Sequence, residues 1–336
     1  MNIAVIGAGA WGTALARQAA SNGNECVIIG RDPEVIGAIN SHHRNPKYFP
    51  DITLDSRITG SLSYECLKDV KAVILAVPSR QIEDVTKTAD RYVTRSVIWI
   101  CAAKGFFPNT NERMSQVIRR CVRKEHCEGI VSLIGPSFAE EVVKGGLTAI
   151  DAVSEEPEAA RKTQLLFSNE HFRVYTGSDL IGAETASSMK NIIAIAAGMA
   201  EGRGLGHNAL AGLITRGLAE ITRFGVALGG DPKSFLGLSG VGDLVLTCTS
   251  RQSRNFSAGY MIGKEDSAEG FWENNRKTVE GVSTCEVLYG YAKELGVELP
   301  ITNEMYEVLF RGAKPSESID RLMRRELKAE EWSSKE

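Results

Sequence analysis

The sequence of 336 residues lacks an excess of either charge: it has 39 Lys and Arg against 42 Asp and Glu, a formal net charge of −3. A protein whose main partner is nucleic acid normally carries a basic surface, so this balance disfavours a polyanion-binding role. No apolar run reaches the roughly 18 residues of a membrane span. We therefore expect no nucleic-acid partner and no membrane span.

The sequence also lacks paired cysteines and metal-binding motifs. Its seven cysteines form no C-x-x-C pair. Cys121, His126 and Cys127 lie close together, but such a group without a matching second half is usually incidental. An odd number of cysteines scattered through apolar segments indicates reduced thiols in a cytosolic protein. The strand pattern begins at residue 2 and leaves no room for a signal peptide. We expect a soluble, cytoplasmic protein without a metal.

What the sequence does contain is a short aliphatic run followed by three glycines in the spacing G-x-G-x-x-G, at Gly7, Gly9 and Gly12. The first glycine allows a tight turn, the second leaves no side chain between backbone and pyrophosphate, and the third lets the next helix pack closely on the strand. The N-terminus of that helix offers free N–H groups to an anion. Because a strand pattern precedes the motif and a helix pattern follows, it predicts a dinucleotide site; the alternative is a glycine-rich turn without a ligand.

The chain changes character near residue 178. Strand and helix patterns alternate before that point, and helical patterns alone follow it. This predicts an N-terminal α/β domain of the Rossmann type with a mostly parallel sheet over residues 1–178, and an all-α domain that carries substrate-binding and catalytic residues over 179–336. After the first, the expected strands are 25–29, 72–77, 96–101, 129–134, 148–153 and 172–175. The polar, proline-punctuated segment 40–60 predicts a surface loop.

The end of the second expected strand bears on the choice of cofactor. In dinucleotide folds an acidic residue at this place binds the 2′-OH of NAD, and an arginine accepts the 2′-phosphate of NADP. Arg31 and Asp32 compete for that role. Asp32 precedes Pro33 and Glu34, so it could equally cap the helix expected over 33–39. We favour the cap, which leaves Arg31 as the cofactor contact and favours NADPH over NADH.

Lys190 is the first candidate for chemistry, because it lies in a long helix of small residues expected over 181–200. Helical spacing places it on one face with Ala183, Ser187, Ala194, Ala197 and Glu201. A helical lysine usually extends its ammonium to solvent. Here the flanking positions are apolar or small, which indicates a central helix. Partial burial would lower the pKa of the lysine toward the range of a general acid or base.

Three other segments carry polar groups suited to a ligand. Lys104 follows the expected strand 96–101, at the carboxyl edge of the sheet where ligands bind in open parallel sheets. Asp243 ends a glycine cluster that follows no strand, so we do not interpret that cluster as a second nucleotide site. Arg254 lies between Ser253 and Asn255, a combination suited to a phosphate or carboxylate, although an ordinary exposed loop is the alternative. With no G-x-S-x-G elbow and no cysteine nucleophile, this set of residues suggests hydride transfer.

Motifs spread over nearly the whole chain resemble those of the bacterial NAD(P)-dependent glycerol-3-phosphate dehydrogenase family. They are Gly7-Ala-Gly-Ala-Trp-Gly12, Ala76-Val-Pro-Ser79, Ala103-Lys-Gly105, Gly135-Pro-Ser-Phe-Ala-Glu140, Met189-Lys-Asn-Ile-Ile193, Gly237-Leu-Ser-Gly-Val-Gly-Asp-Leu244, Ser253-Arg-Asn255 and Val279-Glu-Gly281. The resemblance implies reversible NAD(P)H-dependent reduction of dihydroxyacetone phosphate to sn-glycerol 3-phosphate, a supply reaction for glycerophospholipids.

The resemblance also implies roles for single residues. Lys190 matches the proton donor and acceptor. The substrate-binding positions are matched by Lys104, Gly135, Ser137, Lys190, Asp243, Ser253, Arg254 and Asn255. The cofactor contacts are matched by the glycine turn of Gly7, Gly9, Ala10 and Gly12 and by Trp11, Arg31, Lys104, Ala139, Arg254 and Glu280. Ala10 stands where relatives often have serine, so the pyrophosphate would depend more on backbone N–H groups and Trp11.

Two rival functions remain at the level of sequence. A β-hydroxyacid dehydrogenase would share the nucleotide domain, the helical domain and the lysine, but has little use for a phosphate clamp at Arg254. A redox sensor that binds NADP(H) without turnover would not need Lys104, Lys190 and Asp243 together. The expected partner is a small phosphorylated substrate, and the sequence leaves the oligomeric state open, a homodimer included.

Overall fold

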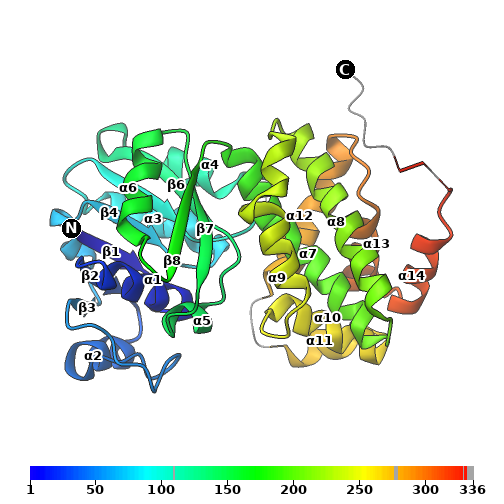
Figure 1. Ribbon diagram of the computed structural model, residues 1–336, viewed down its shortest axis with the longest axis horizontal. Helices are drawn as coiled ribbons and strands as arrows, with labels where there is room; N and C mark the ends of the chain where they lie inside the picture. The colour runs from blue at the N-terminus through cyan, green and yellow to red at the C-terminus, as the bar shows by residue number, and fades with distance from the viewer. Residues whose placement is uncertain (109, 276–278, 328, 331–336) are drawn as a thin grey trace.

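The computed structural model describes residues 1–108, 110–275, 279–327 and 329–330. Figure 1 shows the sheet with its helices on one side of the molecule and a bundle of helices on the other. No helix in these described ranges is long and apolar enough to cross a membrane.

The N-terminal part is built on one eight-stranded sheet with the order β3-β2-β1-β4-β5-β6-β7-β8. All neighbouring pairs are parallel except β6 and β7, so the expected mostly parallel sheet is confirmed. The strands are β1 (Asn2–Ile6), β2 (Glu25–Ile29), β3 (Ile58–Ser61), β4 (Ala72–Leu75), β5 (Val97–Cys101), β6 (Cys127–Ile134), β7 (Thr148–Val153) and β8 (Phe172–Gly177).

Helices cover both faces of this sheet. Ile3 and Val5 of β1 belong to one hydrophobic core, and Ala4 and Ile6 belong to the core on the other face, as expected for a strand buried on both sides. The helices are α1 (Ala10–Ser21), α2 (Pro33–His42), α3 (Ile82–Asp90), α4 (Met114–Cys121), α5 (Ala139–Val143) and α6 (Pro157–Phe167), with 3₁₀ turns η1 (Tyr64–Asp69), η2 (Ser79–Gln81) and η3 (Lys124–His126).

The prediction of a surface loop over residues 40–60 is wrong at both ends. Helix α2 continues to His42, and Ile58–Ser61 forms β3, which pairs in parallel with β2 at the edge of the sheet. Only Ile58 of this short strand is fully buried, so its sequence carries little of the apolar pattern that marks a strand. Pairing with β2, rather than local propensity, makes it a strand.

The C-terminal part is helical from Leu180 onward within the described residues. It contains α7 (Leu180–Gly202), α8 (His207–Ala227), η4 (Pro232–Leu236), the π-turn η5 (Leu238–Gly242), α9 (Asp243–Cys248), α10 (Arg254–Glu265), α11 (Glu269–Asn274), α12 (Glu280–Glu294), α13 (Pro300–Arg311) and α14 (Pro315–Met323). Helix α11 was not expected from the sequence. The division into two domains at residue 178 stays a prediction.

Helix α7 is the centre of the helical part, and it packs against α8, α9, α10, α12 and α13. The crossing with α10 is unusually close because both helices present glycine. A Cβ added to Gly198 would lie 2.0 Å from the carbonyl oxygen of Phe256, and one added to Gly259 would lie 2.0 Å from that of Ile195. This contact brings the N-terminus of α10 to the middle of α7.

A buried carboxylate fastens α7 to the sheet. Glu184 is 5% exposed and accepts hydrogen bonds from the backbone N–H of Ser115 (2.9 Å), from the hydroxyls of Ser115 (2.6 Å) and Ser132 (2.8 Å), and from the Arg113 guanidinium (3.0 Å). These partners belong to the start of α4 and to β6. Because this buried carboxylate has so many hydrogen-bond donors, it holds α7, the start of α4 and β6 in a fixed arrangement.

Candidate active site

The glycine turn after β1 has the shape of a pyrophosphate cradle. Gly7 has φ +120°, and a Cβ there would lie 2.3 Å from the carbonyl oxygen of Ala76. A Cβ on Gly12 would lie 2.0 Å from the carbonyl oxygen of Gly7, so α1 packs directly on the turn. Gly9 differs, because nothing lies within 4 Å of a Cβ added to it. The backbone is therefore open at the one glycine where a ligand should approach.

The start of α1 at Ala10 completes this cradle. Gly9 is its N-cap, and no side chain caps the helix. The first N–H groups of a helix have no partner within the helix, and together with the helix dipole they favour an anion. The turn also follows β1 beside β4, where the strand order reverses and open α/β sheets bind their ligands. These residues fit the pyrophosphate of a nicotinamide dinucleotide.

The end of β2 shows what Asp32 does in the fold. The Asp32 carboxylate accepts hydrogen bonds from the backbone N–H groups of Glu34 (3.2 Å) and Val35 (3.4 Å), and it pairs with Lys47. The predicted cap of α2 is confirmed. Arg31 is exposed at the end of β2, where the second strand of such a fold meets the adenosine ribose.

The loops after β5 and β6 lie at the same carboxyl edge of the sheet as the glycine turn. Lys104 follows β5, and its neighbour Gly105 donates its N–H to Ser188 of α7 at 3.1 Å. Gly135 and Ser137 follow β6, and the Ser137 hydroxyl donates to the Gly135 carbonyl at 3.0 Å. Ala139 then begins α5. The contact with Ser188 thus places this edge of the sheet beside α7, two residues along the helix from the candidate lysine.

A buried cluster joins Lys190 to two segments far away in the sequence. The ammonium of Lys190 donates to the Asp243 carboxylate and to the Thr247 hydroxyl, the latter at 2.8 Å. The other carboxylate oxygen of Asp243 accepts from Lys104 at 3.0 Å. Lys190 is 4% exposed and Asp243 is 1% exposed. The alternative of a lysine that extends to solvent is therefore wrong for Lys190.

The two lysines of this cluster differ in their pKa. Burial lowers the pKa of Lys190; the carboxylate of Asp243 opposes this and the ammonium of Lys104 adds to it, which leaves the pKa at about 7. Burial alone would lower the pKa of Lys104 also, but its pairing with Asp243 outweighs burial and raises that pKa. Lys190 is thus the group that can exchange a proton near neutral pH, while Lys104 stays charged.

A chain of amide contacts orients Asn191, the residue after Lys190. The backbone N–H of Gly281 donates to the Asn255 amide oxygen at 2.9 Å, so the Asn255 nitrogen must donate to the Asn191 oxygen, also at 2.9 Å. A backbone N–H cannot accept, which fixes the direction of both bonds. The amide nitrogen of Asn191 is then left buried, with no hydrogen-bond partner among the described residues. It is a donor available to a ligand.

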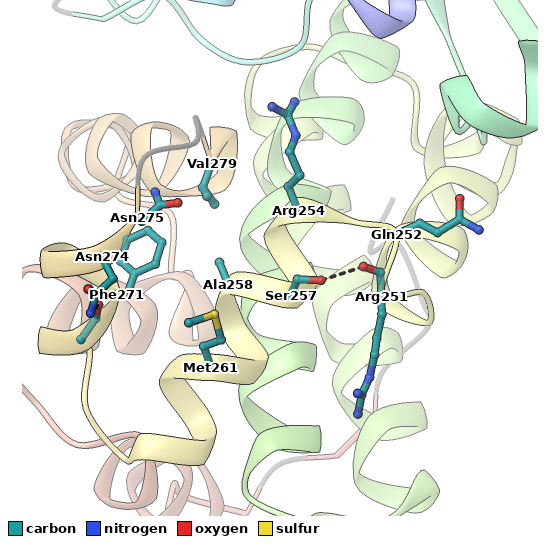
Figure 2. Close-up of a pocket in the computed structure, with 11 residues that line it drawn as sticks. Arg251, Gln252, Arg254, Ser257, Ala258, Met261, Phe271, Asn274, Asn275 and Val279 are labelled. Atoms are coloured by element: carbon teal, nitrogen blue, oxygen red, sulfur yellow. Dashed lines mark hydrogen bonds between the residues drawn. The ribbon is translucent and has the colours of Figure 1, made fainter. Parts of the chain in front are cut away.

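Arg254 lies at the start of α10 and is exposed, while Ser253 before it caps the helix by accepting from the N–H of Phe256. Arg254 lines a cavity of about 350 Å³ together with residues of α10, α11 and the start of α12. Figure 2 shows that its side chain points away from that of Arg251, toward the N-terminal part of the chain. Burial raises the pKa of Glu280, and the positive charges of Arg254, Lys104 and Lys190 oppose this shift. Glu280 therefore lies within the field of all three cations.

The structure thus brings together most of the predicted residues. Lys104, Lys190 and Asp243 touch directly, and the glycine turn and the loop after β6 lie along the same edge. Thr247 and Asn191 are contacts that sequence reasoning missed. Thr247 follows Asp243 by four residues, so one helical turn is the signal that could have indicated it.

The fold and this site together define a class, the nicotinamide-dinucleotide-dependent oxidoreductases that combine a Rossmann-type sheet with a helical part. A family model for the N-terminus of NAD-dependent glycerol-3-phosphate dehydrogenase matches residues 2–160, and one for the C-terminus matches residues 179–320. The chain belongs to the NAD-dependent glycerol-3-phosphate dehydrogenase family.

Individual relatives are similar to this chain over nearly their whole length. The chain is 46% identical over 336 residues to a glycerol-3-phosphate dehydrogenase (NAD(P)+) of Streptococcus thermophilus, covering 99% of this chain and 98% of that protein. It is 45% identical to the enzyme of the same name from Bacillus cereus, covering 98% and 97%. The crystal structure of glycerol-3-phosphate dehydrogenase from Coxiella burnetii superposes with a TM-score of 0.89 at 29% identity, covering 96% and 99%.

Proposed function

We propose that this protein catalyses the reversible reduction of dihydroxyacetone phosphate to sn-glycerol 3-phosphate with NADPH or NADH. The observation that carries this proposal is the buried cluster of Lys190, Asp243 and Lys104, placed at the carboxyl edge of a sheet whose glycine turn fits a dinucleotide. Family membership supports the same reaction, since the relatives are named for it.

The charges of the cluster fit carbonyl reduction. When bound, the nicotinamide nucleotide supplies the hydride. Negative charge then grows on the ketone oxygen, and the Lys190 ammonium both stabilises it and donates the proton. Lys104 stays positively charged and assists by its field. Asp243 holds both ammonium groups in place, and Thr247 fixes Lys190 from its other side.

The substrate phosphate is assigned to the start of α10. Among the described residues the Arg254 guanidinium donates no hydrogen bond, its side chain points away from Arg251 (Figure 2), and Asn255 follows it in α10. A guanidinium binds phosphate strongly because it offers several N–H groups in one plane. Gly135 and Ser137 would complete the substrate site from the sheet edge.

For the cofactor, the glycine turn with Ala10 and Trp11 would hold the pyrophosphate, and Ala139 and Glu280 would line the nicotinamide end together with Lys104 and Arg254. Arg31 is assigned to the 2′-phosphate of NADPH, because Asp32 is already used as the cap of α2. NADPH is therefore the favoured cofactor.

We propose that the reaction takes place in the cytoplasm. All seven cysteines are free of disulfides, as in a protein of the reducing cytoplasm. There the product would supply the backbone of glycerophospholipids. A homodimer is the assembly proposed, and light scattering after size-exclusion chromatography tests it.

One assay separates this function from its rivals. Purified protein is mixed with NADPH and dihydroxyacetone phosphate, and absorbance at the nicotinamide band is followed. Oxidation of NADPH that depends on this substrate is expected. NADPH oxidation only with unphosphorylated β-keto acids would indicate a β-hydroxyacid dehydrogenase, and NADPH binding without any turnover would indicate a sensor.

A further inference from the structure

Ser187 of α7 is a buried side chain that none of the roles above uses. It is 1% exposed, and its hydroxyl has no hydrogen-bond partner among the described residues. A buried hydroxyl without a partner lowers the stability of the fold, so such a group is expected to meet a ligand or a water. The position of Ser187 in α7 favours a ligand over a water.

Helical geometry puts Ser187 on the active-site side of α7. Lys190 and Asn191 follow it by three and four residues and so lie on the same face. Ala183, one turn before it, packs against Ile134 at the end of β6. Ser187 therefore lies between the end of β6, which leads into the Gly135 loop, and the ammonium of Lys190.

The order of groups along α7 matches the order of groups along the substrate. Asn191 contacts Asn255 at the start of α10, the side where Arg254 is assigned the phosphate. Lys190 comes next and is assigned the C2 oxygen. Ser187 lies beyond Lys190, four residues or about 6 Å along the helix from Asn191. In dihydroxyacetone phosphate the phosphate on C3 and the hydroxyl on C1 lie on opposite sides of the C2 ketone.

We propose that Ser187 binds the C1 hydroxyl of the substrate and makes the enzyme specific for a ketone that carries a primary alcohol beside it. This inference rests on the proposed function. It assigns to the Ser187 hydroxyl the substrate group that is left once Lys190 is assigned the C2 oxygen and Arg254 the phosphate. Burial is no objection, because Lys190 is buried to a similar degree in the same place.

Hydroxyacetone phosphate is the probe, because it keeps the ketone and the phosphate and has a hydrogen in place of the C1 hydroxyl. The quantity measured is kcat/KM for NADPH oxidation with each substrate. For Ser187→Ala we expect kcat/KM with dihydroxyacetone phosphate to fall about tenfold and that with hydroxyacetone phosphate to stay within about twofold of the wild type. The preference for dihydroxyacetone phosphate would shrink accordingly.

Thr185→Val is the matched control. Thr185 is also fully buried on α7, and its hydroxyl has no partner among the described residues, but it lies on the other side of the helix, about 200° from Ser187. This variant should keep the wild-type ratio of the two kcat/KM values. Where hydroxyacetone phosphate turns over too slowly, its inhibition constant against dihydroxyacetone phosphate takes the place of kcat/KM.

The proposal is overturned if Ser187→Ala leaves the ratio of the two kcat/KM values unchanged, whether both values fall by the same factor or neither falls. That result is expected if the hydroxyl only binds a water. Should the alanine variant fail to fold, as judged by its melting curve, Ser187→Cys is put through the same comparison. Failure of the proposed function is a separate result, since wild-type protein would then turn over neither substrate.

Discussion

The cofactor half and the chemical half of the proposed site differ in the groups that form them. The cofactor half is a turn of backbone, with Gly7 and Gly12 packed tightly and open space only at Gly9. The chemical half is made of charged side chains, Lys190, Asp243 and Lys104, which come from three distant segments and lie buried together. The first half is built by shape and the second by charge. Substitutions in the two should therefore fail in different ways.

The largest effect is expected in the half built by charge. Lys190→Ala removes the proton donor, so kcat for reduction should fall by roughly 10²- to 10⁴-fold while the Kd for NADPH stays unchanged. Steady-state kinetics and a fluorescence titration measure the two quantities. Lys87→Ala, on the surface of α3, is the control and should keep full activity. If kcat survives in Lys190→Ala, the acid lies elsewhere.

The glycine turn allows the half built by shape to be tested with two nearly identical changes. Gly12→Ala places a methyl group 2.0 Å from a backbone oxygen and should lower the free energy of unfolding by about 2 to 3 kcal/mol. In Gly9→Ala the added methyl group has no neighbour within 4 Å, so the free energy of unfolding should stay unchanged. The Kd for NADPH should rise roughly tenfold or more, because the methyl group occupies the place of the pyrophosphate. Urea unfolding and NADPH titration of both variants measure this. Equal effects of the two changes on both quantities would contradict the account.

Arg254 extends the half built by charge to the substrate phosphate. Arg254→Ala should weaken binding of phosphorylated substrate by about 1.5 to 3 kcal/mol, seen as a raised KM. Arg251→Ala is a matched control from the same turn, since Arg251 points the other way and pairs with Glu201 at 2.6 Å. An unchanged KM in the first variant, or equal changes in both, would remove Arg254 from the phosphate site.

The smallest effect is expected at Arg31, where a single exposed charge adds to a half otherwise made of backbone. Arg31→Ala should raise the KM for NADPH by roughly fivefold, about 1 kcal/mol for an exposed pair of charges, and leave the KM for NADH unchanged. NADH thus serves as the control within the same variant. A loss shared by both cofactors would show that Arg31 does not read the 2′-phosphate.

The contrast between the backbone turn and the charged cluster also explains how much of the structure could be predicted from the sequence. The glycine turn, the parallel strands and the cap at Asp32 follow from short-range rules, and the structure contains them. β3 escaped prediction because its sequence is short and polar, and the polar eight-residue helix α4 escaped for a similar reason. Such elements are stabilised by their neighbours in space.

The charged cluster could be predicted only one residue at a time. Lys190 and Asp243 are 53 residues apart, and the sequence around either residue does not predict contact with the other. The anchor at Glu184 was missed for the same reason, since its partners lie 52 to 71 residues away. The sequence patterns indicated Lys190, Lys104, Asp243 and Arg254 one at a time, the resemblance to a family added their roles, and the fold shows which of them touch.

The central claim is that Lys190 exchanges the proton, and the pH dependence of kcat in both directions tests it most directly. Burial beside Lys104 brings the pKa of Lys190 down to about 7. Reduction needs the charged ammonium, so its kcat should fall as pH rises through that pKa; oxidation of glycerol 3-phosphate needs the neutral amine, so its kcat should rise over the same range. Opposite slopes support the account. Profiles that are flat, or that run in the same direction for both reactions, would contradict it.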